Sequence, residues 1–260
     1  MHKLVLSLCF LAAVIPTLRA EENAEELAKK LNNPVASLVS VPFQNNFDFG
    51  GDNDAFRYQL NFQPVIPITL DADWTMIVRT IVPFIDQQDI IPGTTQSGLG
   101  DITQTFFFAP TKTFGGWIIA PGPVFGYPTA TDSLLGTGKF SIGPSVVALQ
   151  QKGPWTYGML YNHLWSVAGS GGRDRVNSSF YQPFLAYTTR QATTFTINTE
   201  SSYDWEHKQW TVPINLTVSQ VLKLGSQPIS LALGGRYIPE GPTNAPEWGF
   251  RFVMTLMFPK

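Results

Sequence analysis

Apolar and polar side chains alternate along most of this chain, and the alternation constrains its fold more than any other feature. In the stretch 56–66, FRYQLNFQPVI, Phe56, Tyr58, Leu60 and Phe62 alternate with an arginine and three amide side chains. A period of two residues belongs to a β-strand whose two faces meet different surroundings. The apolar face looks inward in a soluble sandwich or ligand-binding barrel, and outward into lipid in an outer-membrane barrel.

Similar alternating runs follow one another to the end of the chain, about twelve in all. Each is near the length that a tilted membrane strand requires. A charged fraction of only 14%, an aromatic fraction of 13%, 22 Gly and 20 Pro also indicate an all-β chain. The runs begin near Leu38, Ala55, Trp74, Asp101, Trp117, Lys139, Trp155, Ser178, Thr193, Trp210, Pro228 and Glu247.

The connections between the runs alternate in length. The odd-numbered ones, such as DQQDIIPGTTQSGLG and PTATDSLLGTG, are mostly long, and the even-numbered ones, such as QKGP and LGSQ, are mostly tight turns. Outer-membrane barrels have short periplasmic turns, longer external loops and an even number of strands. A soluble barrel has no reason to sort its loops in this way.

Tryptophans lie at the ends of the predicted strands and on their apolar faces. A membrane interface selects such positions because the ring is apolar and its N–H requires water. The tryptophans of a sandwich core would gather at strand centres instead. The predicted membrane-interface residues are Trp74, Trp117, Trp155, Trp165, Trp210 and Trp248.

The final run, WGFRFVMTLMF, places an aromatic or aliphatic side chain at every second residue from Trp248 to Phe258. It ends in an aromatic residue almost at the chain end, followed only by Pro259 and Lys260. Together with the loops and tryptophans, it predicts that Phe56, Tyr58 and their alternating partners face lipid. The predicted fold is all-β: a transmembrane antiparallel up-and-down β-barrel of about 12 strands with a short N-terminal helix.

The N-terminus has the three parts of a secretory signal. MHK is basic, LVLSLCFLAAVIP is apolar and TLRA ends in a small residue, so we expect cleavage after Ala20 and export to a bacterial outer membrane. The only cysteine, Cys9, lies in this segment, and a mature chain without cysteine has neither disulfides nor thiolate chemistry. The predicted divisions are a signal peptide at 1–20, a periplasmic helical segment at 21–34 and the barrel at 35–260.

The net charge of the mature chain indicates which classes of partner it can bind. Removal of the signal segment with Lys3 and Arg19 leaves 15 basic and 19 acidic residues, a formal charge of −4. A mildly acidic chain argues against a nucleic-acid partner. The expected partners are outer-membrane lipid and small-molecule solutes, and the sequence leaves the oligomeric state open.

Several segments resemble a known bacterial family. They include SLVSVPFQNNFDFG, QSGLGDITQTFFFAP, GPVFGYPTATDSLLGTGKFSIGP and TTFTINTESSYDWEHKQWTVPIN. Through them nearly the whole mature chain is similar to the MetA-pathway phenol-degradation-like family of outer-membrane transporters. The resemblance implies an outer-membrane β-barrel and transport of small, including aromatic, molecules. It assigns no catalytic residues.

Candidate lumen residues lie on the polar faces of the strands. Arg57, Arg79, Arg236 and Arg251 fall on strands that are near neighbours if the barrel closes, and Asp48 would join them. Guanidinium groups on one wall would raise the local anion concentration, narrow the bore and attract aromatic solutes. Alternatively, the arginines pair with Asp48 and loop acids and merely fill the lumen.

Glu200 faces the lumen from the ninth predicted strand, in INTESSYD. It could oppose the arginines across the lumen and set up a transverse field. It could also be the structural partner of one arginine.

Candidates for catalysis are few. His163 shares the apolar parity of its strand, whereas Ser166 has the opposite parity, so their side chains should diverge. A hydrolytic pair would need both on one face. His207 lies near Asp204 and Glu206 on an external loop, but one histidine on one loop is weak support for a protease. We therefore predict no enzyme activity, no catalytic residues, no cofactor and no metal site.

The predicted function is an outer-membrane channel or transporter for small solutes, anionic or aromatic, that diffuse through a narrow arginine-lined lumen. Two other functions stay open. One is a sealed structural or adhesive barrel, and the other is a barrel-embedded hydrolase, which would require a histidine and a serine or acid within hydrogen-bond distance.

Overall fold

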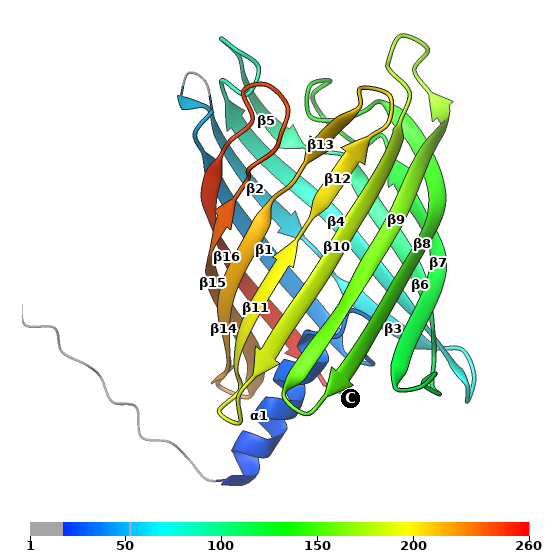
Figure 1. Ribbon diagram of the computed structural model, residues 1–260, viewed down its shortest axis with the longest axis vertical. Coiled ribbons are helices and arrows are strands. Elements are labelled where there is room, and N and C mark those ends of the chain that lie inside the picture. The colour runs from blue at the N-terminus through cyan, green and yellow to red at the C-terminus, as the bar shows by residue number, and fades with distance from the viewer. Residues whose placement is uncertain (1–17, 52–53, 260) are drawn as a thin grey trace, which may run out of the picture.

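The chain folds into a closed antiparallel barrel of twelve strands with one N-terminal helix, as predicted (Figure 1). The computed structural model describes residues 18–51 and 54–259, with side chains from residue 24. Most of the predicted signal segment, residues 1–17 with Cys9, lies outside the described residues. Among the described residues, no helix is long and apolar enough to cross a membrane.

The helix α1 spans Leu18–Leu31. The wall is made of sixteen strand segments. They are β1 (Val39–Phe49), β2 (Phe56–Phe62), β3 (Val65–Thr69), β4 (Trp74–Gln88), β5 (Thr95–Leu99), β6 (Ile102–Pro110), β7 (Trp117–Tyr127), β8 (Lys139–Lys152), β9 (Trp155–Gly169), β10 (Asn177–Thr188), β11 (Thr193–Thr199), β12 (Ser201–Asp204), β13 (Gln209–Thr211), β14 (Ile214–Leu224), β15 (Gln227–Tyr237) and β16 (Trp248–Phe258).

The barrel closes where its last strand meets its first. β16 pairs antiparallel with β1 over the full length of both, from Val39 opposite Phe258 to Phe49 opposite Trp248. The other strands pair with their neighbours along the chain, which is the up-and-down topology that tight turns permit. Closure leaves no unpaired edge, so every strand of the wall has a hydrogen-bonded neighbour on each side.

Four of the twelve strands are interrupted, which is why sixteen segments form twelve strands. β2 and β3 are divided at Gln63 and Pro64, and β13 and β14 at Val212 and Pro213. Proline has no N–H to give to the ladder, so a break is expected there. The other two breaks are at residues 100–101, between β5 and β6, and at Glu200, between β11 and β12. The fourth predicted strand accordingly begins at Thr95 rather than near Asp101.

The connections at one end of the barrel are mostly shorter than those at the other, with 111–116 and 205–208 as the exceptions. One end, called here the short-turn end, carries 70–73, 111–116, 153–154, 189–192 and 225–226, and the other, the long-loop end, carries 50–55, 89–94, 128–138, 170–176, 205–208 and 238–247. The two-residue turns contain Gly153 and Gly225 with φ of 59° and 64°. Such positive φ values suit the tight hairpins that join twisted strands.

The apolar faces of the strands form the outer surface of the barrel. Leu216 and Leu233 are each 62% exposed there. On the neighbouring strands β2, β1 and β16, the Phe47 ring lies 4.9 Å from Tyr58 and 4.6 Å from the exposed Phe250. The segment 56–66, FRYQLNFQPVI, therefore turns Tyr58 and its alternating partners outward, as a barrel in lipid requires.

Two apolar clusters hold the N-terminal segment against the short-turn end, where α1 lies in Figure 1. Leu27 and Ala28 of α1 pack with Val221 of β14 and Met257 of β16. Beyond the helix, Val35 packs with side chains of β4, β6, β7, β8 and β9, among them Ile77 and the fully buried Phe107. Residues 32–38, called here the crossing segment, thus extend from the first cluster to the second at Val35 and return to the first at Leu38.

Candidate functional site in the barrel lumen

A chain of cavities occupies the interior of the barrel. The central one has a volume of about 480 Å³ and is bounded by side chains of most strands, including Asn46, Gln59, Arg79, Gln182, Glu200 and Arg236. Polar residues predominate among them, although Ile81, Leu164 and Phe180 also contribute. A polar, water-accessible interior below an apolar outer face is the arrangement of a membrane barrel.

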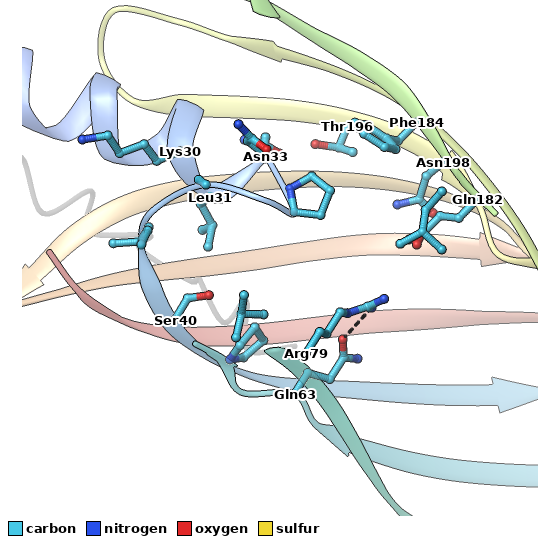
Figure 2. Close-up of a pocket in the computed structure, with 17 residues that line it drawn as sticks. Lys30, Leu31, Asn33, Ser40, Gln63, Arg79, Gln182, Phe184, Thr196 and Asn198 are labelled. Atoms are coloured by element: carbon cyan, nitrogen blue, oxygen red, sulfur yellow. Dashed lines mark hydrogen bonds between the residues drawn. The ribbon is translucent and has the colours of Figure 1, made fainter. Parts of the chain in front are cut away.

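A second cavity, of about 220 Å³, lies at the short-turn end between the crossing segment and the wall (Figure 2). It shares Gln63, Arg79 and Gln182 with the central cavity. These three residues, called here the neck, therefore stand where the two cavities meet. Figure 2 shows Arg79 and Gln63 joined by a hydrogen bond, with Gln182 on the facing strands.

Two further cavities, of about 570 and 480 Å³, open at the long-loop end. The 570 Å³ cavity shares the lining residues Ser178 and Ser202 with the central cavity. It also shares Asp204 and His207 with the other cavity at this end. Neighbouring cavities thus have lining residues in common along the whole barrel. The lumen is a succession of chambers between the crossing segment and the loops.

Four charged side chains meet in the lumen. Glu200 accepts two hydrogen bonds from Arg251, at 2.9 and 2.7 Å, and lies 3.8 Å from Arg236. Arg236 in turn donates to Asp48 at 2.7 Å. The two arginine side chains are 4% and 7% exposed, so the acids compensate positive charges that have lost most of their water. The group has no net formal charge.

Two asparagines complete this cluster. Asn46 accepts from Nε of Arg251 at 2.8 Å and from Arg236 at 3.3 Å. Asn215 accepts from Arg236 at 2.9 Å and donates to Asn198. Sequence reasoning missed both asparagines. Their polar-face parity, shared with the charged residues, was the signal that could have found them.

The other two arginines have neutral partners. Arg79 donates to Oε1 of Gln63 at 3.1 Å, and Arg57 donates to Oε1 of Gln87 at 3.0 Å, with Gln87 bonded onward to Gln96. Within the described residues, neither guanidinium has a carboxylate within 4 Å. The structure therefore brings Arg236, Arg251, Asp48 and Glu200 together and leaves Arg57 and Arg79 outside that group.

The long loops are anchored to the barrel. The carboxylate of Asp101 accepts from the backbone N–H of Ala130 at 3.1 Å and of Thr137 at 2.6 Å. Arg173, from the 170–176 loop, donates to the carbonyl oxygens of Ser133, Gly136 and Thr137. These bonds hold the 128–138 loop at the mouth of the lumen.

The six tryptophans predicted for the membrane interface lie on the outer surface, with exposed fractions between 37% and 54%. Trp74, Trp117 and Trp155 open strands at the short-turn end. Trp165, Trp210 and Trp248 lie toward the long-loop end. The six tryptophans therefore form two groups on the outer surface, one toward each end of the barrel. Their contact with a membrane interface stays a prediction.

The histidines occupy different places. His163 is on the outer face, and Ser166 is not its partner but accepts a hydrogen bond from Val176. His207, on the 205–208 turn, bonds to the Asp204 carboxylate at 2.9 Å. That hydrogen bond raises the pKa of His207 above its ordinary value of 6.5. No cluster of His, Cys, Asp and Glu suited to a metal exists among the described residues.

Comparison with known proteins shows which solved structures share this fold. No family model matches the chain, and no curated protein matches it, so membership of the MetA-pathway family stays a prediction. The chain is similar to the COG4313 outer membrane channel from Pseudomonas putida F1, with a TM-score of 0.64 and 14% identity over 85% of this chain and 94% of that one.

The NanC porin is also similar, with a TM-score of 0.53 and 14% identity over 85% of this chain and all of that one. Outer membrane phospholipase A from Escherichia coli matches with a TM-score of 0.49 and 10% identity over 85% of this chain and 90% of that one, which is too distant to bear on chemistry. The chain therefore has the fold of outer-membrane β-barrels.

Proposed function

We propose that this protein is an outer-membrane channel for small solutes, with a preference for anions that is set at the neck. The observation that carries the proposal is the position of Arg79, which lines both the central cavity and the cavity beside the crossing segment. A solute that moves along the lumen must pass this guanidinium, which donates a hydrogen bond to the neutral side chain of Gln63.

Electrostatics supports an anion preference. Because the acids compensate Arg236 and Arg251, the positive charge at the neck is that of Arg79, which has no carboxylate within 4 Å among the described residues. A cation in a narrow bore with low-dielectric walls raises the local concentration of anions and lowers that of cations. The Gln63 and Gln182 amides add neutral hydrogen-bonding groups at the same level.

The lining beside the neck supports a substrate class. Leu160, Phe184 and Val65 line the same cavity as Arg79, and they belong to or pack against the apolar cluster inside the wall. A guanidinium next to apolar side chains fits a small organic anion with a carboxylate at one end and an apolar or aromatic body. The family resemblance, which implies transport of aromatic molecules, agrees with this substrate class.

A sealed structural barrel is the second candidate, because one observation favours it. The crossing segment spans the short-turn end and is held by Val35 in the apolar cluster and by Asn33, which donates to Gln151 at 3.3 Å. If this segment never moves, the lumen stays closed at that end. The two candidates differ in whether the folded protein conducts ions.

The test is single-channel conductance of the refolded mature protein in planar bilayers, with the reversal potential measured under a salt gradient. We expect discrete steps and anion preference. Arg79→Ala should lower the anion preference, because it removes the cation that every solute meets, and it should raise the conductance because the neck widens.

Arg190→Ala is the matched control, since Arg190 is an exposed residue of the 189–192 turn, outside the lumen. It removes the same formal charge and should leave the reversal potential unchanged. An unchanged reversal potential in Arg79→Ala would contradict the role of the neck. If a correctly folded barrel shows no conductance, and still shows none after the crossing segment is removed, the result would favour the sealed structural barrel.

A further inference from the structure

A serine, a histidine and an asparagine form a hydrogen-bonded chain on the outer face of the barrel. Nδ1 of His163 lies 2.7 Å from Oγ of Ser179, and its Nε2 lies 3.1 Å from Oδ1 of Asn177. His163 is opposite Ser179 in the pairing of β9 with β10, and Asn177 is two residues away on the same face. This is the convergence of histidine and serine that the sequence did not reveal, since Ser166 lies on the other face.

The hydrogen bonds have a consistent direction. The amide nitrogen of Asn177 donates to Glu206 at 3.4 Å, which leaves Oδ1 of Asn177 as the acceptor for Nε2–H of His163. Nδ1 of the neutral imidazole then carries the lone pair and accepts the hydroxyl proton of Ser179. An oriented base beside a hydroxyl is the arrangement that activates a serine nucleophile, with asparagine as the orienting group.

Aromatic side chains surround the hydrogen-bonded residues Ser179, His163 and Asn177. On β9, His163 is two residues from Trp165, with ring centroids 4.1 Å apart, and Trp210 and Tyr203 lie on the strands beyond β10. Tryptophan and tyrosine gather at the boundary between hydrocarbon and headgroups, which is the depth of the ester groups of a phospholipid. At the interface level that the tryptophans predict, the three residues would face the depth of the ester bonds.

A tryptophan covers the serine. Nε1–H of Trp205 donates to Oγ of Ser179 at 2.9 Å, and Ser179 is only 1% exposed. Trp205 itself is 48% exposed and belongs to the 205–208 turn rather than to a strand. Rotation of this indole away from the wall would uncover the hydroxyl without changing the barrel.

We propose that Ser179, His163 and Asn177 form a lipid ester hydrolase site on the outer surface of the barrel, with Trp205 as its cover. Oγ of Ser179 attacks the ester carbonyl carbon while its proton moves to Nδ1 of His163. The ester C–O bond breaks, and the departing glycerol oxygen takes that proton. Water then attacks the acyl carbon while His163 accepts its proton. The acyl C–Oγ bond breaks, the departing Oγ of Ser179 takes that proton, and fatty acid and free serine result. The step needs no reactant except water.

The first experiment uses a fluorophosphonate probe, which reacts covalently with activated serines, on the folded full-length barrel in phospholipid vesicles. We expect labelling at Ser179, located by mass spectrometry, and loss of labelling in Ser179→Ala. His163→Ala should slow labelling by about 100-fold or more, the usual contribution of a general base. Trp205→Ala should accelerate it, because the hydroxyl becomes accessible.

Ser178→Ala is the matched control. Ser178 is the neighbour of Ser179 on the lumen face. This variant should label like the wild type. Heat-modifiable migration on gels shows that each variant is folded. Absence of labelling at Ser179 in both the wild type and Trp205→Ala would overturn the proposal.

The second measurement is the release of fatty acid from the same vesicles, followed by mass spectrometry. The Trp205→Ala variant should release fatty acid, and the double variant with Ser179→Ala should not. Labelling at Ser179 without any release would overturn the assignment to lipid esters. Because the site is on the outer face, Ser179→Ala should leave channel conductance unchanged, so this proposal and the channel proposal can fail separately.

Discussion

At the scale of single residues, Glu200 is the carboxylate that joins the two buried arginines of the lumen cluster. Its carboxylate compensates the buried guanidinium of Arg251 and lies near that of Arg236. Glu200→Gln would leave buried positive charge without a partner, so we expect the free energy of unfolding to fall by about 3–5 kcal/mol. Urea unfolding of the barrel in detergent or vesicles measures this change.

The matched control for that prediction is Glu247→Gln. Glu247 is exposed on the 238–247 loop, and its backbone N–H and carbonyl groups bond to Phe49 and Ile238. The substitution removes the same charge and should change the stability little. Equal stability of Glu200→Gln and the control would show that the arginines find other partners or water in the lumen.

His207 provides a pH-dependent contact at the mouth of the lumen. The hydrogen bond to Asp204 raises the pKa of His207, so its contribution to the closed loops is complete below the unfolded pKa of about 6.5. That contribution is lost as the pH rises through the folded pKa. An NMR titration of the imidazole should give a pKa above 6.5, and Asp204→Asn should lower it.

Asp174→Asn is the comparison for this titration. The carboxylate of Asp174 lies 3.7 Å from Nε2 of His207, against 2.9 Å between Asp204 and Nδ1. Coulomb energy falls with distance, and only the shorter contact is a hydrogen bond, so Asp174→Asn should lower the pKa of His207 less than Asp204→Asn does. The reverse order would contradict the two distances from His207 to these carboxylates.

At the scale of elements, the crossing segment controls the short-turn end. Val35 is 6% exposed and anchors the segment among apolar side chains of the facing strands. A carboxylate cannot be buried there without a partner, so Val35→Asp should release the segment from the wall. We expect larger single-channel conductance and faster cleavage of the segment by an added protease.

Ser37→Asp is the control for the crossing segment, because it introduces the same charge at an exposed position two residues along. It should keep the conductance of the wild type. If Val35→Asp also conducts like the wild type, the segment does not limit the flow, and the neck at Arg79 is the narrowest point.

The elements themselves could be predicted well from the sequence. Period-two alternation, turn residues and tryptophans located twelve strands and the order of short and long connections. The internal breaks could not be located in the same way. Pro64 and Pro213 interrupt their strands, whereas Pro42 and Pro121 remain inside β1 and β7. Whether a missing N–H breaks a strand depends on the partner strand that would have accepted its hydrogen bond.

At the scale of the whole molecule, the barrel is apolar outside and polar inside, and this can be tested directly. Leu233 lies near the middle of β15 on the outer face, and Ala232 is its neighbour on the inner face. Leu233→Arg should destabilise the barrel in a bilayer by about 2–4 kcal/mol, since a charge would meet hydrocarbon. Unfolding in vesicles of defined lipid measures this change.

Ala232→Arg introduces the same side chain toward the lumen, where water and polar groups are present. It should cost less stability than Leu233→Arg and should change the conductance instead. If the two variants reverse this order, the inside and outside of the barrel have been exchanged. The comparison needs no knowledge of the transported solute.

The sequence by itself determined the class of fold, the face of each strand that turns outward and the list of charged lumen residues, because these follow from local alternation. Only the tertiary structure decided which of those residues meet. Asp48 and Arg236 are 188 residues apart, and Glu200 and Arg251 are 51 apart. The pairing of Ser179 with His163 depends on the register of β9 and β10. Register, strand breaks and bore result from closing the whole barrel, and no local pattern encodes them.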